Sequence, residues 1–234
     1  MPGRRDIVVA LALLALVVVF FHSALLGGEQ FYAGDTYRYF YPLKKMAADA
    51  VRSGQAPVWN PLVHSGMPLH AAVQAAILYP FSILFYLLPF DFAYKWYIAL
   101  HVFLAAAATY ALGRRWQLRT VSAASAAICY AFSGYVISFI DGLNIFSSIV
   151  WLPVVFLFFE RAVEKPTLSR VVLAAFAVAA QTLAGDPVSG YYTFLICGIY
   201  WLVLLGVYSF QRKPRLEMAA RLAVFPAVAL LALA

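Results

Sequence analysis

Asp35, in the sequence Gly34-Asp35-Thr36, is the acidic residue whose position most favours chemistry. It follows the apolar run 7–26 by only a few residues, so we expect its carboxylate close to the end of that run. A carboxylate that is partly shielded from water has a raised pKa and can act as a general base or bind a metal ion. It could instead be the N-cap of a helix. Spacing leaves both interpretations open.

A second set of polar residues lies in a segment rich in proline. Residues 56–81 contain four prolines, and Trp59, Asn60 and Gln74 lie among them. Because proline fixes φ and favours turns, we predict a structured, turn-rich loop here. His64 and His70 suggest a metal pair, but a separation of six residues in a loop is weak evidence. The metal ligands are therefore left unassigned, and a divalent cation stays open as a cofactor.

The composition decides what kind of protein must position these residues. Of the 234 residues, 65% are hydrophobic and only 12% are charged, and the mean hydropathy is +0.84. A soluble domain has about 45–50% apolar and about 25% charged residues, so this chain has too little charge to cover a water-exposed surface. The composition predicts a multi-pass membrane protein and excludes disordered, collagen-like and disulfide-stapled classes.

The apolar runs predict an all-α protein with about seven transmembrane helices. The predicted spans are 7–26, 96–112, 121–140, 145–159, 171–184, 191–208 and 222–234. This division gives a first transmembrane helix in 1–26, an outer loop in 27–95 and a helix bundle in 96–234. The last run is shorter than the roughly 20 residues that cross a bilayer. We therefore expect the chain to stop inside its seventh span and to be part of a longer protein.

The distribution of Lys and Arg predicts the sidedness. If the stretch 71–88, which Pro80 interrupts, does not span, the segments 1–6, 113–120, 160–170 and 209–221 face the cytoplasm. They hold 12 of the 17 basic residues. If it does span, most of the basic residues lie outside. That contradicts the rule that cytoplasmic loops are rich in Lys and Arg. We therefore predict a cell-membrane protein with a cytoplasmic N-terminus, an extracytoplasmic loop 27–95 and no nucleic-acid partner.

One amphipathic helix is predicted inside the outer loop. Its apolar face follows helical spacing: Leu43, Met46, Ala47, Ala50 and Val51. Its polar face carries Lys44, Lys45, Asp49 and Arg52, and Gly54 is expected to end the helix. We predict that this helix lies on the membrane surface, with the preceding tyrosines in the interfacial aromatic belt.

The loop as a whole resembles the bacterial YfhO-type membrane proteins. The similarity is carried by Gly34-Asp35, Phe40-Tyr41-Pro42, Pro57-x-Trp59-Asn60-Pro61, Gly66-Met67-Pro68, Gln74 and Tyr79-Pro80. It continues through Phe132-Ser133-Gly134-Tyr135, Gly142-Leu143-Asn144, Trp151-Leu152-Pro153 and Gly185-Asp186-Pro187. These proteins belong to the GT-C class of polyprenyl-phosphate-sugar-dependent glycosyltransferases. In relatives the last motif often reads Gly-His-Pro, which is a departure here.

The resemblance implies a function at the outer leaflet. Such enzymes take a lipid-linked sugar donor and transfer the sugar to a cell-envelope polymer or lipid acceptor. It also implies that Asp35 is the catalytic base or a metal ligand. Arg38, Lys44 and Lys45 could then stabilise the departing phosphate, unless all three belong to a solvated helix face. Trp59, Asn60 and Gln74 are further candidates for substrate binding.

Two outer turns complete the candidate site. Asp141 and Asn144 lie in one turn and Asp186 in the next. Together with the loop, these turns could surround a single opening. The alternatives are an ordinary glycine turn at Asp141 and an N-cap before Pro187 at Asp186.

A second class of function competes with the enzyme. The chain could be a non-catalytic membrane scaffold or a partner in the transport of lipid-linked sugars. Transport needs a polar path, and the predicted spans are nearly free of charge, with His101 and Gln181 as the main polar residues. A scaffold stays open, and this part of the protein by itself could be inactive.

Overall fold

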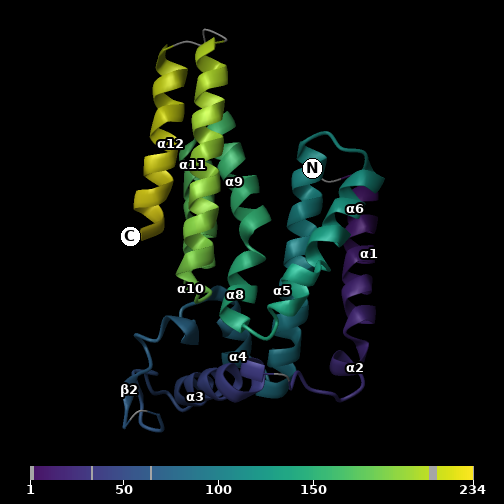
Figure 1. The fold of residues 1–234 in the computed structure, drawn as a ribbon, viewed down its shortest axis with the longest axis vertical. Coiled ribbons are helices and arrows are strands. Elements are labelled where there is room, and N and C mark those ends of the chain that lie inside the picture. The colour runs from purple at the N-terminus through teal and green to yellow at the C-terminus, as the bar shows by residue number, and fades with distance from the viewer. Residues whose placement is uncertain (1–2, 33, 64, 211–214, 234) are drawn as a thin grey trace.

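The long helices run side by side, and a set of shorter elements lies across one of their ends (Figure 1). The computed structural model describes residues 3–32, 34–63, 65–210 and 215–233. Of the residues that the structure describes, 76% are helical. In the described ranges the only strands are β1 (Trp59–Asn60) and β2 (Met67–Pro68), which pair antiparallel. The all-α prediction is confirmed.

The first half of the chain contains α1 (Arg4–Phe20), α2 (His22–Leu25), the π-helix η1 (Thr36–Phe40), α3 (Tyr41–Arg52), the 3₁₀ helices η2 (Val73–Ala75) and η3 (Pro80–Ser82), α4 (Ile83–Leu87) and α5 (Phe90–Arg115). The second half contains α6 (Thr120–Ala131), α7 (Gly134–Ser138), α8 (Leu143–Ile149), α9 (Leu152–Glu164), α10 (Leu168–Leu183), α11 (Pro187–Phe210) and α12 (Arg215–Leu233).

Four helical stretches among the described residues are long and apolar enough to cross a membrane. They are Phe90–Arg115, Thr120–Ser138, Leu143–Glu164 and Pro187–Ser209. The second joins α6 to α7, and the third joins α8 to α9. Leu168–Leu183 is a shorter apolar helix. A transmembrane helix needs about 20 apolar residues, so these four stretches are compatible, by length and composition, with a helical membrane protein.

Helix α5 is the centre of the bundle, where it packs against α1, α4, α6 and α9. Its contact with α6 is close because the facing side chains are small. Ala123, Ala127 and Ala131 recur every four residues on α6 and are fully buried. Small residues at this spacing let two helix backbones approach, which is how apolar helices gain packing energy without a hydrophobic driving force.

The segment that precedes α5 folds into short pieces at the end of the bundle. The ambiguous stretch 71–88 becomes η2, η3 and the five-residue α4, all too short to cross a bilayer. Helix α3 lies across the ends of the long helices, and the β1–β2 hairpin lies beyond it (Figure 1). The amphipathic helix that the sequence predicts is therefore present, with Gly54 just beyond its end at φ +76°.

The helix that contains the predicted span 96–112 extends beyond it at both ends. Helix α5 begins at Phe90, directly after Pro89, and not at 96. Hydropathy underestimates the helix because its first turns carry Asp91 and Lys95. The loop between α1 and α5 is shorter than predicted for this reason.

Candidate functional site

Asp35 lies immediately before η1, and its side chain is exposed. Its backbone is already helical, with φ −72° and ψ −22°, and its carboxylate makes no capping hydrogen bond. A capping residue has an extended backbone that aims its side chain at the free N–H groups. The N-cap interpretation of Asp35 is therefore wrong. The protein itself does not bury this carboxylate.

The residue after Asp35 is fixed to the bundle. Thr36 is only 2% exposed. Its hydroxyl donates to the carbonyl oxygen of Ile140 at 2.6 Å, and its backbone N–H donates to Asp141 Oδ1 at 3.4 Å. The hydroxyl of Tyr94, on α5, donates to the Thr36 carbonyl oxygen at 3.0 Å. The backbone next to Asp35 is therefore held by the hydrogen bonds of Thr36 to α5 and to the turn after α7.

The residue before Asp35 has a backbone conformation that favours glycine. Gly34 has φ +47°, in the left-handed region, and a Cβ atom there would collide with the carboxylate of Asp141. Asp141 therefore contacts the residues on both sides of Asp35. This arrangement brings together two of the predicted site residues, although 105 positions separate Thr36 from Asp141.

A groove of about 700 Å³ lies along the exposed side of η1 and α3. It is lined by Tyr37, Arg38, Tyr41, Pro42, Lys45, Met46, Asp49 and Leu62. Arg38 is exposed, and Lys45 is paired with Asp49 at 3.2 Å. Two of the predicted phosphate-binding cations therefore share one groove with two tyrosines. Aromatic faces beside cations suit a ligand that carries both a sugar and an anionic group.

Tyr41 is held at the edge of this groove. Its hydroxyl donates to Asp91, on the first turn of α5. Burial, together with this hydrogen bond to a carboxylate, raises the pKa of Tyr41 to about 12. Tyr41 is consequently a neutral donor at physiological pH, and it fixes α3 to the start of α5.

Lys44 does not belong to the polar face where the sequence places it. It is 3% exposed, and its Nζ donates to the Ala75 carbonyl oxygen at 3.4 Å. The Nζ lies 5.4 Å from the ring centre of Tyr97 and 5.7 Å from that of Phe85, within cation–π range. Burial lowers the pKa of Lys44 from 10.5 to about 7. The Lys44 side chain therefore lies on the buried side of α3, whereas Arg38 and Lys45 line the open groove.

The two predicted outer turns contact each other at a second junction, beside the loop. Asn144 donates from Nδ2 to the Gly185 carbonyl oxygen at 3.3 Å. Gly185 has φ +108°, and a Cβ atom there would lie 3.2 Å from the Cα of Gln74. The two turns therefore contact each other and the loop. The side chain of Gln74 itself is exposed.

Asp186 is a helix cap. Its Oδ2 accepts hydrogen bonds from the backbone N–H of Ser189, at 3.1 Å, and from the hydroxyl of the same residue. Pro187 is the first residue of α11. This arrangement confirms the capping interpretation, because Asp before Pro at a helix start satisfies free N–H groups and presets φ.

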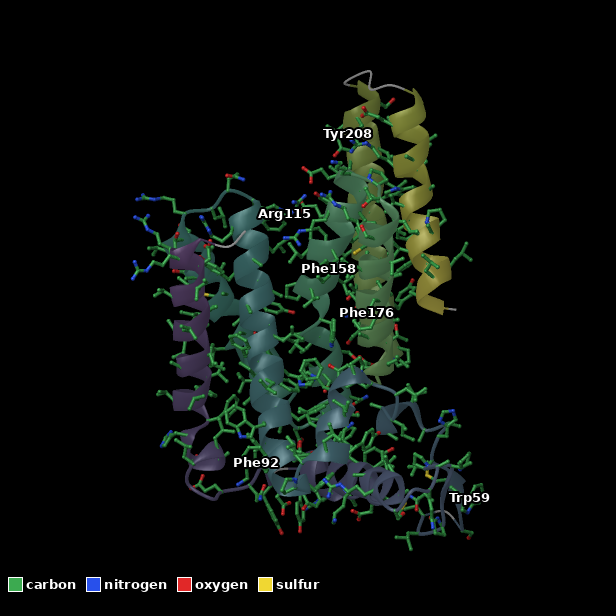
Figure 2. The ribbon with its side chains drawn as sticks, turned by 180° about the vertical axis from the view of Figure 1, so that it is seen from behind. Trp59, Phe92, Arg115, Phe158, Phe176 and Tyr208 are labelled. Carbon is green, nitrogen blue, oxygen red and sulfur yellow. The ribbon has the colours of Figure 1, made fainter. Side chains whose placement is uncertain are left out.

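Trp59 and Asn60 lie in the hairpin, and Trp59 is at the outer corner of the molecule (Figure 2). Asn60 is 4% exposed, and its Oδ1 accepts from the backbone N–H of Leu62 at 2.9 Å, which is a turn contact. The Trp59 ring covers Gly66, whose φ is +108°. Both residues therefore have roles in the hairpin. Of the histidine pair, His64 falls outside the described residues, and His70 is exposed.

A buried hydrogen-bond chain that the sequence analysis did not identify fastens the loop to the bundle. His101 Nδ1 lies 2.6 Å from the Tyr97 carbonyl oxygen, so this nitrogen carries the proton. Tyr79 therefore donates to His101 Nε2 at 2.6 Å and accepts from Trp151 Nε1 at 2.7 Å. The sequence signals were His101, an isolated polar residue in an apolar run, and the presence of Tyr79 and Trp151 in the motifs that carry the family resemblance.

No cluster of three or more His, Cys, Asp and Glu side chains occurs in the part of the chain that the structure describes. The carboxylate of Asp141 contacts both neighbours of Asp35. A divalent cation stays a prediction from sequence.

Comparisons with models of protein families, with curated proteins and with solved structures find no match to this chain.

Proposed function

We propose that the chain is a membrane glycosyltransferase module of the GT-C class, similar to the YfhO-type proteins. It takes a polyprenyl-phosphate sugar as donor and transfers the sugar to a cell-envelope polymer or lipid on the outer face of the cell membrane. The proposal includes about seven spanning helices, a cytoplasmic N-terminus and an extracytoplasmic loop between α1 and α5.

One observation supports this function most. Asp35 is an exposed carboxylate on a backbone segment that Thr36 fixes to the bundle, and Arg38, three residues later, lines the groove along α3. A general base must be positioned and must reach the proton that it removes. The contacts of Thr36 supply the positioning, and the exposure of Asp35 supplies the access.

The chemistry assigns a role to each group. Asp35 accepts the proton of an acceptor hydroxyl, whose oxygen then forms the bond to the anomeric carbon of the sugar. The bond from that carbon to the donor phosphate breaks, and the phosphate leaves with the bonding electrons. Arg38 and Lys45 stabilise the charge that develops on it. Lys44 has no part in this step because it is buried on the other side of α3.

The substitution Asp35→Asn tests the proposal in the intact protein, expressed in a strain from which its gene is deleted. We expect sugar transfer to fall by about 10²–10⁴, since this is the typical contribution of a general base. Expression and membrane insertion should stay normal, because the carboxylate makes no capping bond that Asn would lose. The readout is mass spectrometry of the cell-envelope polymers and lipids for the sugar that the deletion removes.

Glu29→Gln is the matched control, because Glu29 is another exposed carboxylate of the same loop. It should restore the sugar to the level of the unmodified protein. If Asp35→Asn restores it equally, Asp35 is not the base, and the non-catalytic scaffold becomes the better interpretation.

A further inference from the structure

Two adjoining cavities in the bundle share part of their lining and are together called the groove beside α11. The first, of about 360 Å³, is lined at one end by Gln181, Ser189 and Thr193. The second, of about 260 Å³, extends along α9 to Leu112 and Trp116 at the C-terminal end of α5. Tyr130, Leu152 and Ile196 line both cavities. The groove therefore has a polar end near the turn between α10 and α11 and an apolar remainder.

The groove lies between the two candidate spans that the protein covers least. Only 11% of the apolar window of Pro187–Ser209 and 22% of that of Thr120–Ser138 are buried, against 61% for Phe90–Arg115. Helices with mostly uncovered apolar faces border lipid in a membrane protein. Tyr135 and Tyr192, which line the polar end, are 58% and 59% exposed. A molecule can consequently enter this groove from the bilayer.

Gln181 leaves one hydrogen-bonding atom unused at the polar end. Its Nε2 donates to the Ser148 carbonyl oxygen at 3.0 Å and to the Thr193 hydroxyl at 2.8 Å. The Ser148 carbonyl can only accept, so the orientation of the amide is fixed. Gln181 is 1% exposed, and its Oε1 is buried without a hydrogen-bond partner among the described residues. A buried acceptor in this state is costly, and a ligand with a donor group would relieve the cost.

The lining of the groove also restricts the charge of the ligand. The residues that line either cavity in the described part of the chain include no Lys, Arg, His, Asp or Glu. A phosphate would therefore lie in the groove without a cation, which is unfavourable at low dielectric. The cations Arg38 and Lys45 line the separate groove on α3.

We propose that the groove beside α11 binds one neutral lipid with a free hydroxyl group, such as a diacylglycerol. Its hydroxyl lies at the polar end and donates to Oε1 of Gln181 when the side chains that cover this atom move aside, and its hydrocarbon chain lies along Leu152, Ile196 and Phe156. The site is distinct from the proposed glycosyl-transfer site, and it does not depend on that function.

Native mass spectrometry of the detergent-purified protein tests this site, with 1,2-dioctanoylglycerol as the probe. We expect a 1:1 adduct. The acetate of the same lipid lacks the hydroxyl and should bind at least about tenfold more weakly, equivalent to about 1.4 kcal/mol. Dioctanoyl phosphatidic acid, which replaces the hydroxyl by a phosphate, should also bind more weakly.

The variant Ile196→Trp fills the groove without touching the bonds of Gln181, and we expect it to abolish the adduct. Ile199→Trp is the matched control. Ile199 is also an exposed isoleucine of α11, but it lines a different cavity, so this variant should bind as the unmodified protein does. Each of three results would overturn the proposal: no adduct, equal binding of the acetate or the phosphatidic acid, or equal binding by the two variants.

Discussion

At the scale of single residues, the neighbours of Asp35 restrict its position more than its own contacts do. Thr36 is buried and bonded to Ile140, Asp141 and Tyr94, and Gly34 leaves just enough space for the Asp141 carboxylate. In the sequence Gly34-Asp35-Thr36, Gly34 is therefore explained by the space that it leaves and Thr36 by the hydrogen bonds that it makes.

The substitution Gly34→Ala should destabilise the protein in two ways. The left-handed backbone costs a non-glycine residue about 1–2 kcal/mol, and the added methyl group displaces Asp141 from Thr36. The control is Gly54→Ala, which has φ +76° but meets no atom within 4 Å and so has only the backbone cost. The measurement is the midpoint of thermal unfolding in detergent, and Gly34→Ala should lower it more. Equal losses would contradict the contact with Asp141.

The burial of Lys44 destabilises the folded protein when its amine is charged, because a buried amine is more stable uncharged. Its pKa of about 7 in the folded state lies below 10.5 in the unfolded state. Between these two values the unfolded chain binds more protons, so the stability of the protein should rise with pH in this window and fall as pH drops towards 7. Below about pH 7 the full cost is present.

We therefore expect Lys44→Met to stabilise the protein at pH 7 by about 1 kcal/mol or more, because it replaces a buried charge by an apolar side chain of similar length. The variant should also lose the rise in stability between pH 7 and pH 10. Lys45→Met, at an exposed position of the same helix, should keep that rise. Thermal unfolding across this pH range is the measurement, and identical curves for the two variants would contradict the burial of Lys44.

At the scale of elements, the segment 71–88 is held against the bundle by one hydrogen-bonded residue. Tyr79 is 2% exposed and joins His101 on α5 to Trp151 before α9. Burial raises the pKa of the Tyr79 hydroxyl well above 10, so it stays a donor to His101 at all physiological pH values. The short helices of this segment have few backbone bonds of their own, and their place depends on such tertiary contacts.

Tyr79→Phe should release this segment while leaving the long helices folded. The substitution leaves Trp151 Nε1 and His101 Nε2 buried without partners, and each such group costs about 1–3 kcal/mol. We expect faster amide hydrogen exchange in 71–88 than in the unmodified protein. Tyr86→Phe is the comparison, because that half-buried hydroxyl donates only to the Ile77 carbonyl oxygen. A release by Tyr86→Phe as large as that by Tyr79→Phe would argue against the role of the buried chain.

At the scale of the whole molecule, the two ends of the bundle differ in chemistry. Arg115 and Tyr208 lie at one end, and Phe92 and Trp59 at the other (Figure 2). At the first end Arg115 pairs with Glu160 at 2.6 Å and Glu164 at 2.7 Å. The other end carries α3 and the groove with Arg38 and Lys45.

The proposed orientation places the Arg115 end in the cytoplasm, and a cysteine at Ser53 tests it. Ser53 is exposed, directly after α3. In intact cells an impermeant thiol reagent should label Ser53→Cys without permeabilisation, whereas a cysteine at Gln117, which follows α5, should need it. Labelling of the Gln117 variant alone in intact cells would reverse the orientation.

The sequence by itself determined the class of protein and the positions of most helices. Hydropathy and helical periodicity are local properties, and the bilayer forces every apolar run of sufficient length to satisfy its backbone bonds as a helix. For the same reason α3 could be predicted from the spacing of Leu43, Ala47 and their neighbours. The cap at Asp186 was also readable, because Asp before Pro at a helix start is a local arrangement.

Only the tertiary structure decided how these elements use their side chains. Lys44 is buried because α3 packs against α4 and η2, which moves its covered face to include Lys44 and Ala48 beside the predicted apolar stripe. Asp35 caps nothing because η1 begins with a helical backbone at that residue. The contacts of Thr36 with Asp141 and of Tyr79 with Trp151 join residues 105 and 72 positions apart. Such pairings depend on which helices pack together, and a pattern within one segment carries no information about its partner.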